Sequence, residues 1–87
     1  MNGAATQVFA REFDHDFFKL PAAIQKLVQQ KIDSMGLRLE HFPHYRMTGS
    51  TDYRLRVGDY RVIYDFNVGR GEIYLLAIGH RREVYRH

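Results

Sequence analysis

The chain has 87 residues, of which 45% are hydrophobic, and a formal net charge of +3 at pH 7. This length predicts a single domain over residues 1–87 with a modest core, and the hydrophobic fraction argues against a disordered chain. Cysteine is absent, which excludes disulfides and thiolate chemistry. Without a long apolar run or a signal-peptide pattern, we expect a cytoplasmic protein that does not span a membrane. The mildly basic charge favours a polyanionic partner. Residues 1–5 are small and polar, and we expect them to be disordered.

The first half of the chain predicts one strand and two helices. Residues 7–12 are typical of a short strand. Asp14 is expected to cap a short helix that ends at Lys19. Pro21 is expected at the start of a second helix, and Gly36 at its end. Apolar residues recur at helical spacing along this second helix: Ile24, Leu27, Val28, Ile32 and Met35. The helical hairpin is therefore predicted to cover one face of a sheet.

The second half is predicted to consist of strands. After a connector with one short strand near residues 45–47, three longer strands are expected, over residues 53–57, 60–66 and 72–78. Gly58-Asp59 is a two-residue turn signal, and residues 67–71 form a looser turn. The predicted fold class is α+β: a short N-terminal strand, a helical hairpin and an antiparallel β-meander, with the helices packed on one sheet face.

The two-residue turn predicts a register that gathers arginines on one face of the sheet. Val57 is paired with Tyr60, so that Arg56 opposes Arg61. Leu55 then opposes Val62, and Arg54 opposes Ile63. Because side chains alternate along a strand, one face is expected to be apolar: it holds Tyr53, Leu55, Val57, Tyr60, Val62, Tyr64 and Phe66. Arg54, Arg56 and Arg61 share the other face.

This arrangement of arginines favours an anion site. Like charges directly opposite each other destabilise a sheet, whereas guanidinium groups suit phosphate oxygens. The alternative is a solvated face with counter-ions, for which the candidates are Asp59, Asp65 and Glu72. The tail adds groups that can contact a nucleic acid: Arg81, Arg82 and Arg86 for phosphates and Tyr85 for stacking.

Other chemistry is poorly supported. His15, His41 and His44 lack the spacing of metal ligands and lie in surface-like segments. No serine has an evident base partner, and no glycine-rich phosphate loop is present. We therefore predict no metal and no cofactor.

Two segments resemble the RelE/ParE superfamily of bacterial and archaeal toxins. They are Tyr53-Arg-Leu-Arg-Val-Gly-Asp-Tyr-Arg-Val-Ile-Tyr64 and Ala77-Ile-Gly-His-Arg-Arg-Glu-Val-Tyr-Arg86. The first is closer to the RelE side, and the resemblance covers nearly the whole chain from about Gln7. It implies a RelE-like toxin that binds a cognate antitoxin, enters the ribosomal A site and cuts messenger RNA without a metal. The RNA 2′-hydroxyl would be the nucleophile.

The resemblance also implies roles for individual residues. Arg61 and Arg81 would bind the scissile phosphate and its developing charge, and Tyr85 would stack on a nucleotide. Arg54, Arg56 and Arg82 would bind substrate phosphates. Lysines are typical of the family at positions 54 and 56, and arginine stays protonated, so those two arginines are expected to stabilise charge rather than accept a proton. His80 and His87 are then the candidates for the general base.

Two alternatives to this function stay open at the level of sequence. One is a ParE-type toxin that inhibits DNA gyrase by binding. The other is a degenerate toxin that folds and binds its antitoxin but has lost activity.

Overall fold

The computed structural model describes residues 4–80, which form an α+β domain as predicted. The elements in chain order are β1 (Thr6–Phe9), α1 (Arg11–Phe17), α2 (Ala22–Leu37), β2 (Tyr45–Arg46), β3 (Tyr53–Val57), β4 (Tyr60–Asn67) and β5 (Glu72–His80). The three long strands begin where the sequence predicted, whereas the first strand begins one residue earlier than expected, at Thr6, and ends three residues earlier, at Phe9.

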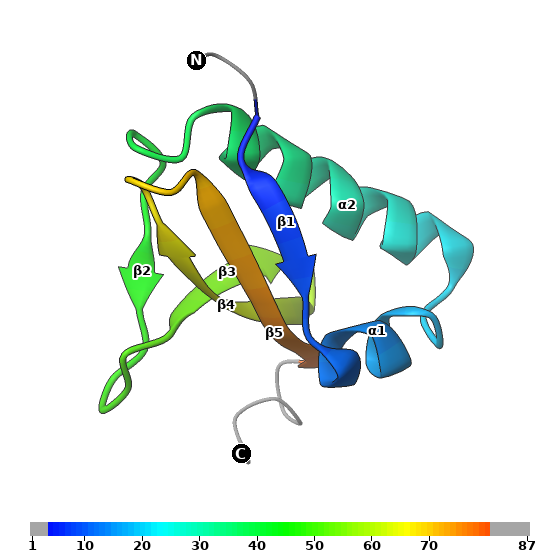
Figure 1. Cartoon of the computed structure of the whole chain (residues 1–87). Helices are drawn as coiled ribbons and strands as arrows, with labels where there is room; N and C mark the ends of the chain where they lie inside the picture. Colours follow the sequence, from blue (N-terminus) through cyan, green and yellow to red (C-terminus); the bar gives the residue numbers. More distant parts are fainter. Residues whose placement is uncertain (1–3, 81–87) are drawn as a thin grey trace.

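The five strands form one mixed sheet in the order β1-β5-β4-β3-β2. β3, β4 and β5 form the predicted antiparallel meander, and β2 extends it antiparallel to β3. β1 lies parallel to β5 at the opposite edge (Figure 1). This pairing brings the first strand next to the last, because the helical hairpin between β1 and the meander crosses one face of the sheet.

Both helices pack on the same face of the sheet, where the core lies (Figure 1). Phe13 and Phe17 of α1 are buried one turn apart and stack with their ring centroids 5.4 Å apart. From α2, three apolar side chains enter the same core: Val28, Ile32 and Met35. The sheet supplies the alternate residues of its strands, which are Leu55, Val57, Val62, Tyr64, Ile73, Leu75 and Ile78. We call this the inner face and the opposite one the outer face.

The start of α1 differs from the prediction. The helix begins at Arg11 rather than at Asp14, and Ala10 occupies the N-cap without any side-chain cap. The burial of Phe13 and Phe17 explains the difference, because docking an aromatic face onto the sheet outweighs the modest gain from a capping carboxylate. Tertiary packing, not the capping signal, therefore decides where this helix begins.

The second helix also departs from its predicted pattern at two positions. Gly36 lies inside α2, which continues to Leu37, and its backbone is approached closely by Ala5. The Ala5 amide donates to the Gly36 carbonyl at 2.9 Å, so this part of the terminus that we expected to be disordered is tied to the helix. Leu27 was placed in the buried stripe but is 50% exposed. No helix within residues 4–80 has the length and apolar character needed to cross a bilayer.

The predicted hairpin register is confirmed. Val57 pairs with Tyr60, Leu55 with Val62, and Arg56 with Arg61. Gly58 has a positive φ of 61° whereas Asp59 does not, which is the pattern of a type II′ turn and requires glycine at the first position. The sequence did not predict the bulge in β5, where Leu76 is the extra residue between two paired neighbours.

Candidate functional site

The outer face of the sheet carries the three arginines at its β3–β4 end. Arg56 and Arg61 are direct cross-strand partners, and Arg54 precedes Arg56 by two residues on the same side of β3. Arg56 is exposed, Arg54 is half-buried, and Arg61, on a strand with neighbours on both sides, is only 7% exposed. Gly79, which has no side chain, stands opposite Arg61 on the other neighbouring strand. The arrangement concentrates positive charge where a phosphate can be bound from one side.

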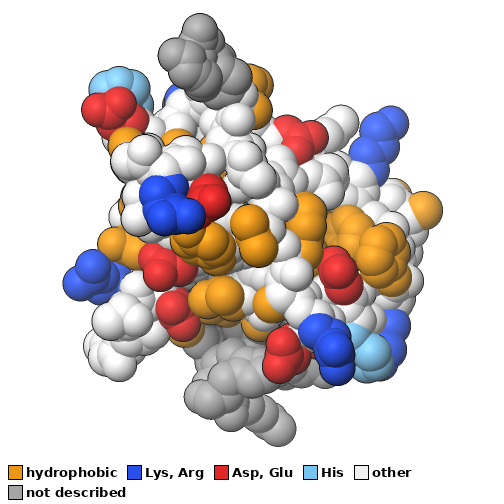
Figure 2. Space-filling view, viewed as in Figure 1, with side chains coloured by type: hydrophobic (Ala, Val, Ile, Leu, Met, Phe, Trp, Pro, Cys, Tyr) orange, Lys and Arg blue, Asp and Glu red, His pale blue; other side chains and the backbone are white. Residues whose placement is uncertain are grey.

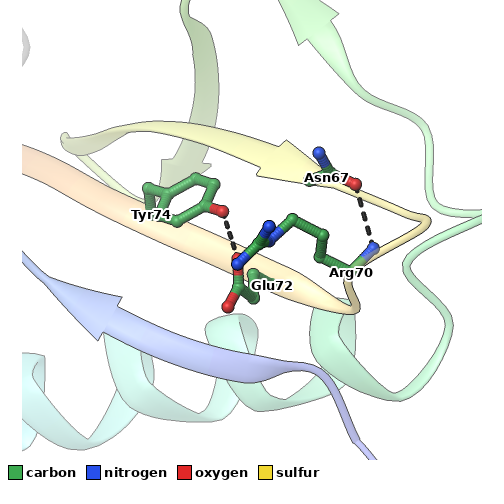
Figure 3. Close-up of polar contacts among 4 residues, drawn as sticks. All are labelled: Asn67, Arg70, Glu72 and Tyr74. Carbon is green, nitrogen blue, oxygen red and sulfur yellow. Dashed lines mark hydrogen bonds and ion pairs between the residues drawn. The ribbon is translucent and has the colours of Figure 1, made fainter.

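The other end of the outer face has a different charge arrangement. Arg70 donates through Nε to Oε1 of Glu72 at 3.0 Å, and the Tyr74 hydroxyl donates to the same carboxylate oxygen (Figure 3). The Arg70 amide also donates to the Asn67 side chain at 2.9 Å. Glu72, one of the predicted counter-ions for the arginine face, is thus paired within its own turn.

These contacts shift the pKa values of the three groups. The Tyr74 hydrogen bond, followed by the one from Arg70, lowers the pKa of Glu72. The same contacts raise the pKa of Tyr74 and of Arg70, with the hydrogen bond to Glu72 as the largest cause in each case. The carboxylate is therefore held in its charged form by its neighbours.

The remaining predicted site residues are divided between the inner face and the part of the chain outside the described residues. His80 pairs with Tyr60, and their ring centroids are 5.9 Å apart in an edge-on contact. This register places His80 on the same side as Tyr60 and Val62, opposite to the arginines. Arg81, Arg82 and Tyr85, together with Arg86 and His87, lie outside residues 4–80, so their roles remain predictions.

Sequence reasoning missed the role of His44, which it assigned to a surface-like segment. The ring is half-buried and stacks on Phe66 with centroids 3.9 Å apart. Its Nε2 lies 2.8 Å from the Leu39 carbonyl and its Nδ1 lies 2.6 Å from the Tyr64 hydroxyl. A carbonyl can only accept, so Nε2 carries a proton, and in the neutral ring the Tyr64 hydroxyl donates to Nδ1.

These two hydrogen bonds join the connector to the core. Burial raises the pKa of Tyr64 far above its ordinary value, which keeps the hydroxyl protonated. Phe42 and Tyr53 complete an aromatic cage around His44. The only local signal for this cage was the aromatic composition around a Pro-His pair, and its partners come from β3 and β4. Within the described residues, no cluster of three or more His, Asp or Glu side chains is placed to hold a metal ion.

Residues 4–80 thus form a small α+β fold with a helical hairpin on one side of a five-stranded sheet. The family described as the ParE toxin of type II toxin–antitoxin systems, parDE, matches residues 8–85. The chain therefore belongs to this family, within the RelE/ParE superfamily. No curated protein matches the sequence.

Solved structures with the same fold are RelE toxins. A chain of the RelB–RelE antitoxin–toxin complex from Methanococcus jannaschii is 26% identical, with a TM-score of 0.68 over 90% of this chain and 94% of that one. The archaeal RelE–RelB complex from Pyrococcus horikoshii gives 25% identity and a TM-score of 0.73, over 93% and 99%. The isolated Escherichia coli RelE toxin, at 16% identity, shares the fold with a TM-score of 0.75 over 94% and 92%.

Proposed function

We propose that this toxin is a metal-independent endoribonuclease that cuts messenger RNA in the ribosomal A site and so blocks translation. The observation that carries the proposal is the placement of Arg56 directly opposite Arg61, with Arg54 beside them on the outer face. Guanidinium groups gathered on one face suit the oxygens of a phosphate, which they can bind through paired hydrogen bonds. The RelE fold of the solved structures supports the same function.

The chemistry requires little of the protein beyond charge and position. The RNA 2′-oxygen attacks the adjacent phosphorus, the bond from phosphorus to the 5′-oxygen breaks, and a cyclic phosphate and a free 5′-hydroxyl result. A base removes the proton from the 2′-oxygen, and the departing 5′-oxygen takes one up. Guanidinium groups of Arg61 and Arg81 would stabilise the extra negative charge on the phosphorane oxygens. Arg54, Arg56 and Arg82 would hold flanking phosphates, and Tyr85 would stack on a base.

The identity of the base is constrained by the sheet register. Arginine stays protonated in proteins, so Arg54 and Arg56 do not remove the proton. His80 projects from the inner side of β5, away from the arginines, so of the two candidate bases we favour His87 over His80.

Brief induction of the toxin followed by mapping of mRNA 5′ ends tests this function. We expect new 5′-hydroxyl ends within translated regions, and we expect Arg81→Ala to remove them together with the growth defect. Intact transcripts during growth arrest would contradict the proposal.

The family match favours a second candidate, inhibition of DNA gyrase by binding, since the matching family is described as the parDE toxin. A supercoiling assay separates the two candidates: a gyrase inhibitor blocks supercoiling by purified gyrase and leaves transcripts intact. In either case we propose that the protein acts in the cytoplasm and is neutralised by a cognate antitoxin, as the RelB complexes of the similar structures suggest.

A further inference from the structure

A cleft of about 390 Å³ runs along the edge of β3 that points away from β4, beside the arginines of the outer face. Three consecutive residues of the strand line it: Arg54, Leu55 and Arg56. Successive side chains of a strand point to opposite faces, so a cavity that contacts all three must lie at the strand's edge. Lys31 of α2 closes the cleft on the inner side.

Pro43 explains why this edge is open. Tyr45 pairs with Arg54, and continuing that antiparallel register places Pro43 opposite Arg56. Proline has no N–H to donate, so β2 begins only at Tyr45 and the ladder with β3 does not extend to Arg56. The two-residue turn makes Val57 and Tyr60 a hydrogen-bonded pair, and the backbone N–H and C=O of Arg56 therefore point away from β4 towards the cleft.

The lining combines positive charge with aromatic rings. Among the described residues that line it, Lys31, Arg54 and Arg56 are cations and none is a carboxylate. Tyr45 is 61% exposed and lies on the same side of the sheet as its partner Arg54. Phe42 also contributes to the wall, with the Arg38 guanidinium 5.1 Å from its ring centroid. Cations beside an exposed ring are the groups that bind single-stranded nucleic acids, whose phosphates need charge and whose bases stack.

We infer that this cleft is a binding subsite for one nucleotide of single-stranded RNA that flanks the cleaved bond. Arg56 and Lys31 hold its phosphate, and its base stacks on Tyr45. The inference rests on RNA being the substrate, and it adds a subsite that extends the arginine face around the sheet edge. An acidic peptide added as a further strand fits less well, because Arg56 is the one position between β2 and the turn whose backbone groups are directed to this edge.

Binding of a short 2′-O-methyl RNA to the purified toxin tests the subsite, since this RNA cannot supply the attacking hydroxyl. We expect Tyr45→Ala to weaken binding about tenfold, as loss of one stacked base predicts, and Tyr45→Phe to leave it unchanged. Lys31→Ala is expected to weaken binding and to lower the slope of log affinity against log salt by about 0.7, the value for one phosphate of a single strand.

Lys26→Ala is the matched control, because Lys26 is exposed on the same helix but does not line the cleft. Equal affinities for wild type, Tyr45→Ala and Lys31→Ala would overturn the subsite while leaving cleavage at the arginine face intact. Variants that lose binding of a polyglutamate peptide but keep RNA binding would overturn it in favour of an acidic partner. If the wild type neither binds the RNA nor cuts translated mRNA, the proposed function fails and the subsite fails with it.

Discussion

The two ends of the outer face differ in how their charged side chains are arranged. At the β4–β5 turn, Arg70, Glu72 and Tyr74 are near neighbours in sequence and satisfy one another through hydrogen bonds. At the β3–β4 hairpin, the register forces Arg56 against Arg61. Charges that are balanced locally stabilise a turn, whereas like charges set directly opposite each other destabilise a sheet. Because of this difference, we propose that the hairpin end is the functional one.

The largest effect is expected from removing the most buried cation of the hairpin end. Arg61→Ala should lower the rate of mRNA cleavage by about 100-fold or more, because it removes a positioned donor to the developing charge. Arg70→Ala at the other end is the control and should leave the rate unchanged. Primer extension on translated mRNA measures both. Arg61→Lys, which keeps the positive charge but not the guanidinium geometry, should retain part of the cleavage activity. If Arg70→Ala lowers the cleavage rate as much as Arg61→Ala does, the two ends of the outer face do not differ in function.

A second change tests how the hairpin end is held in place. Tyr64→Phe leaves Nδ1 of His44 buried without its donor, and we expect it to reduce the free energy of unfolding by about 1–3 kcal/mol. Adding His44→Phe removes the unsatisfied Nδ1 and should recover part of that loss, but not all of it, because the Leu39 carbonyl loses its Nε2 donor. Urea denaturation measures the three proteins. If the double variant loses a further amount of unfolding free energy as large as the first loss, the two side chains act independently.

A third change reverses the charge arrangement at the hairpin. Arg56→Glu converts a repulsive cross-strand pair into an attractive one and should stabilise the fold by about 0.2–1 kcal/mol, while weakening binding of RNA. Arg70→Glu, the matched change at the other end, should destabilise the protein because it places a carboxylate beside Glu72. Thermal melts at low salt measure both. If Arg56→Glu lowers the melting temperature, the arginine pair is not a source of strain.

The smallest effect concerns the acid dependence of the β4–β5 end. The folded-state pKa of Glu72 is lowered, so its contribution to stability is present above its unfolded pKa and is lost as the pH falls through the folded value. Tyr74→Phe removes the largest cause, and the pKa of Glu72 should rise towards its ordinary value. NMR titration of the Glu72 carboxyl measures this shift. The stability of the two proteins should converge at low pH, and an unchanged titration curve would contradict the hydrogen bond.

Local sequence was enough for the starts of the three long strands and for the hairpin. Gly58 permits a positive φ, the two-residue turn sets the register, and alternation then separates Leu55 from Arg54 and Arg56. Local sequence was not enough for the start of α1. The burial of Phe13 and Phe17 favours a helix that begins at Arg11, before the predicted N-cap Asp14. Gly36 was expected to end α2 but lies one residue before its last residue, Leu37, where its carbonyl accepts a hydrogen bond from the Ala5 amide.

The sequence by itself determined that three arginines share one face, since a β-strand has a side-chain period of two and a short turn leaves no freedom of register. Only the tertiary structure decided what surrounds them. The cage around His44 needs side chains from β3 and β4, and the cleft needs Lys31 from α2 beside Tyr45 and Arg56. These contacts join residues far apart in the chain, and they depend on how the hairpin and the connector pack on the sheet, which no local periodicity encodes.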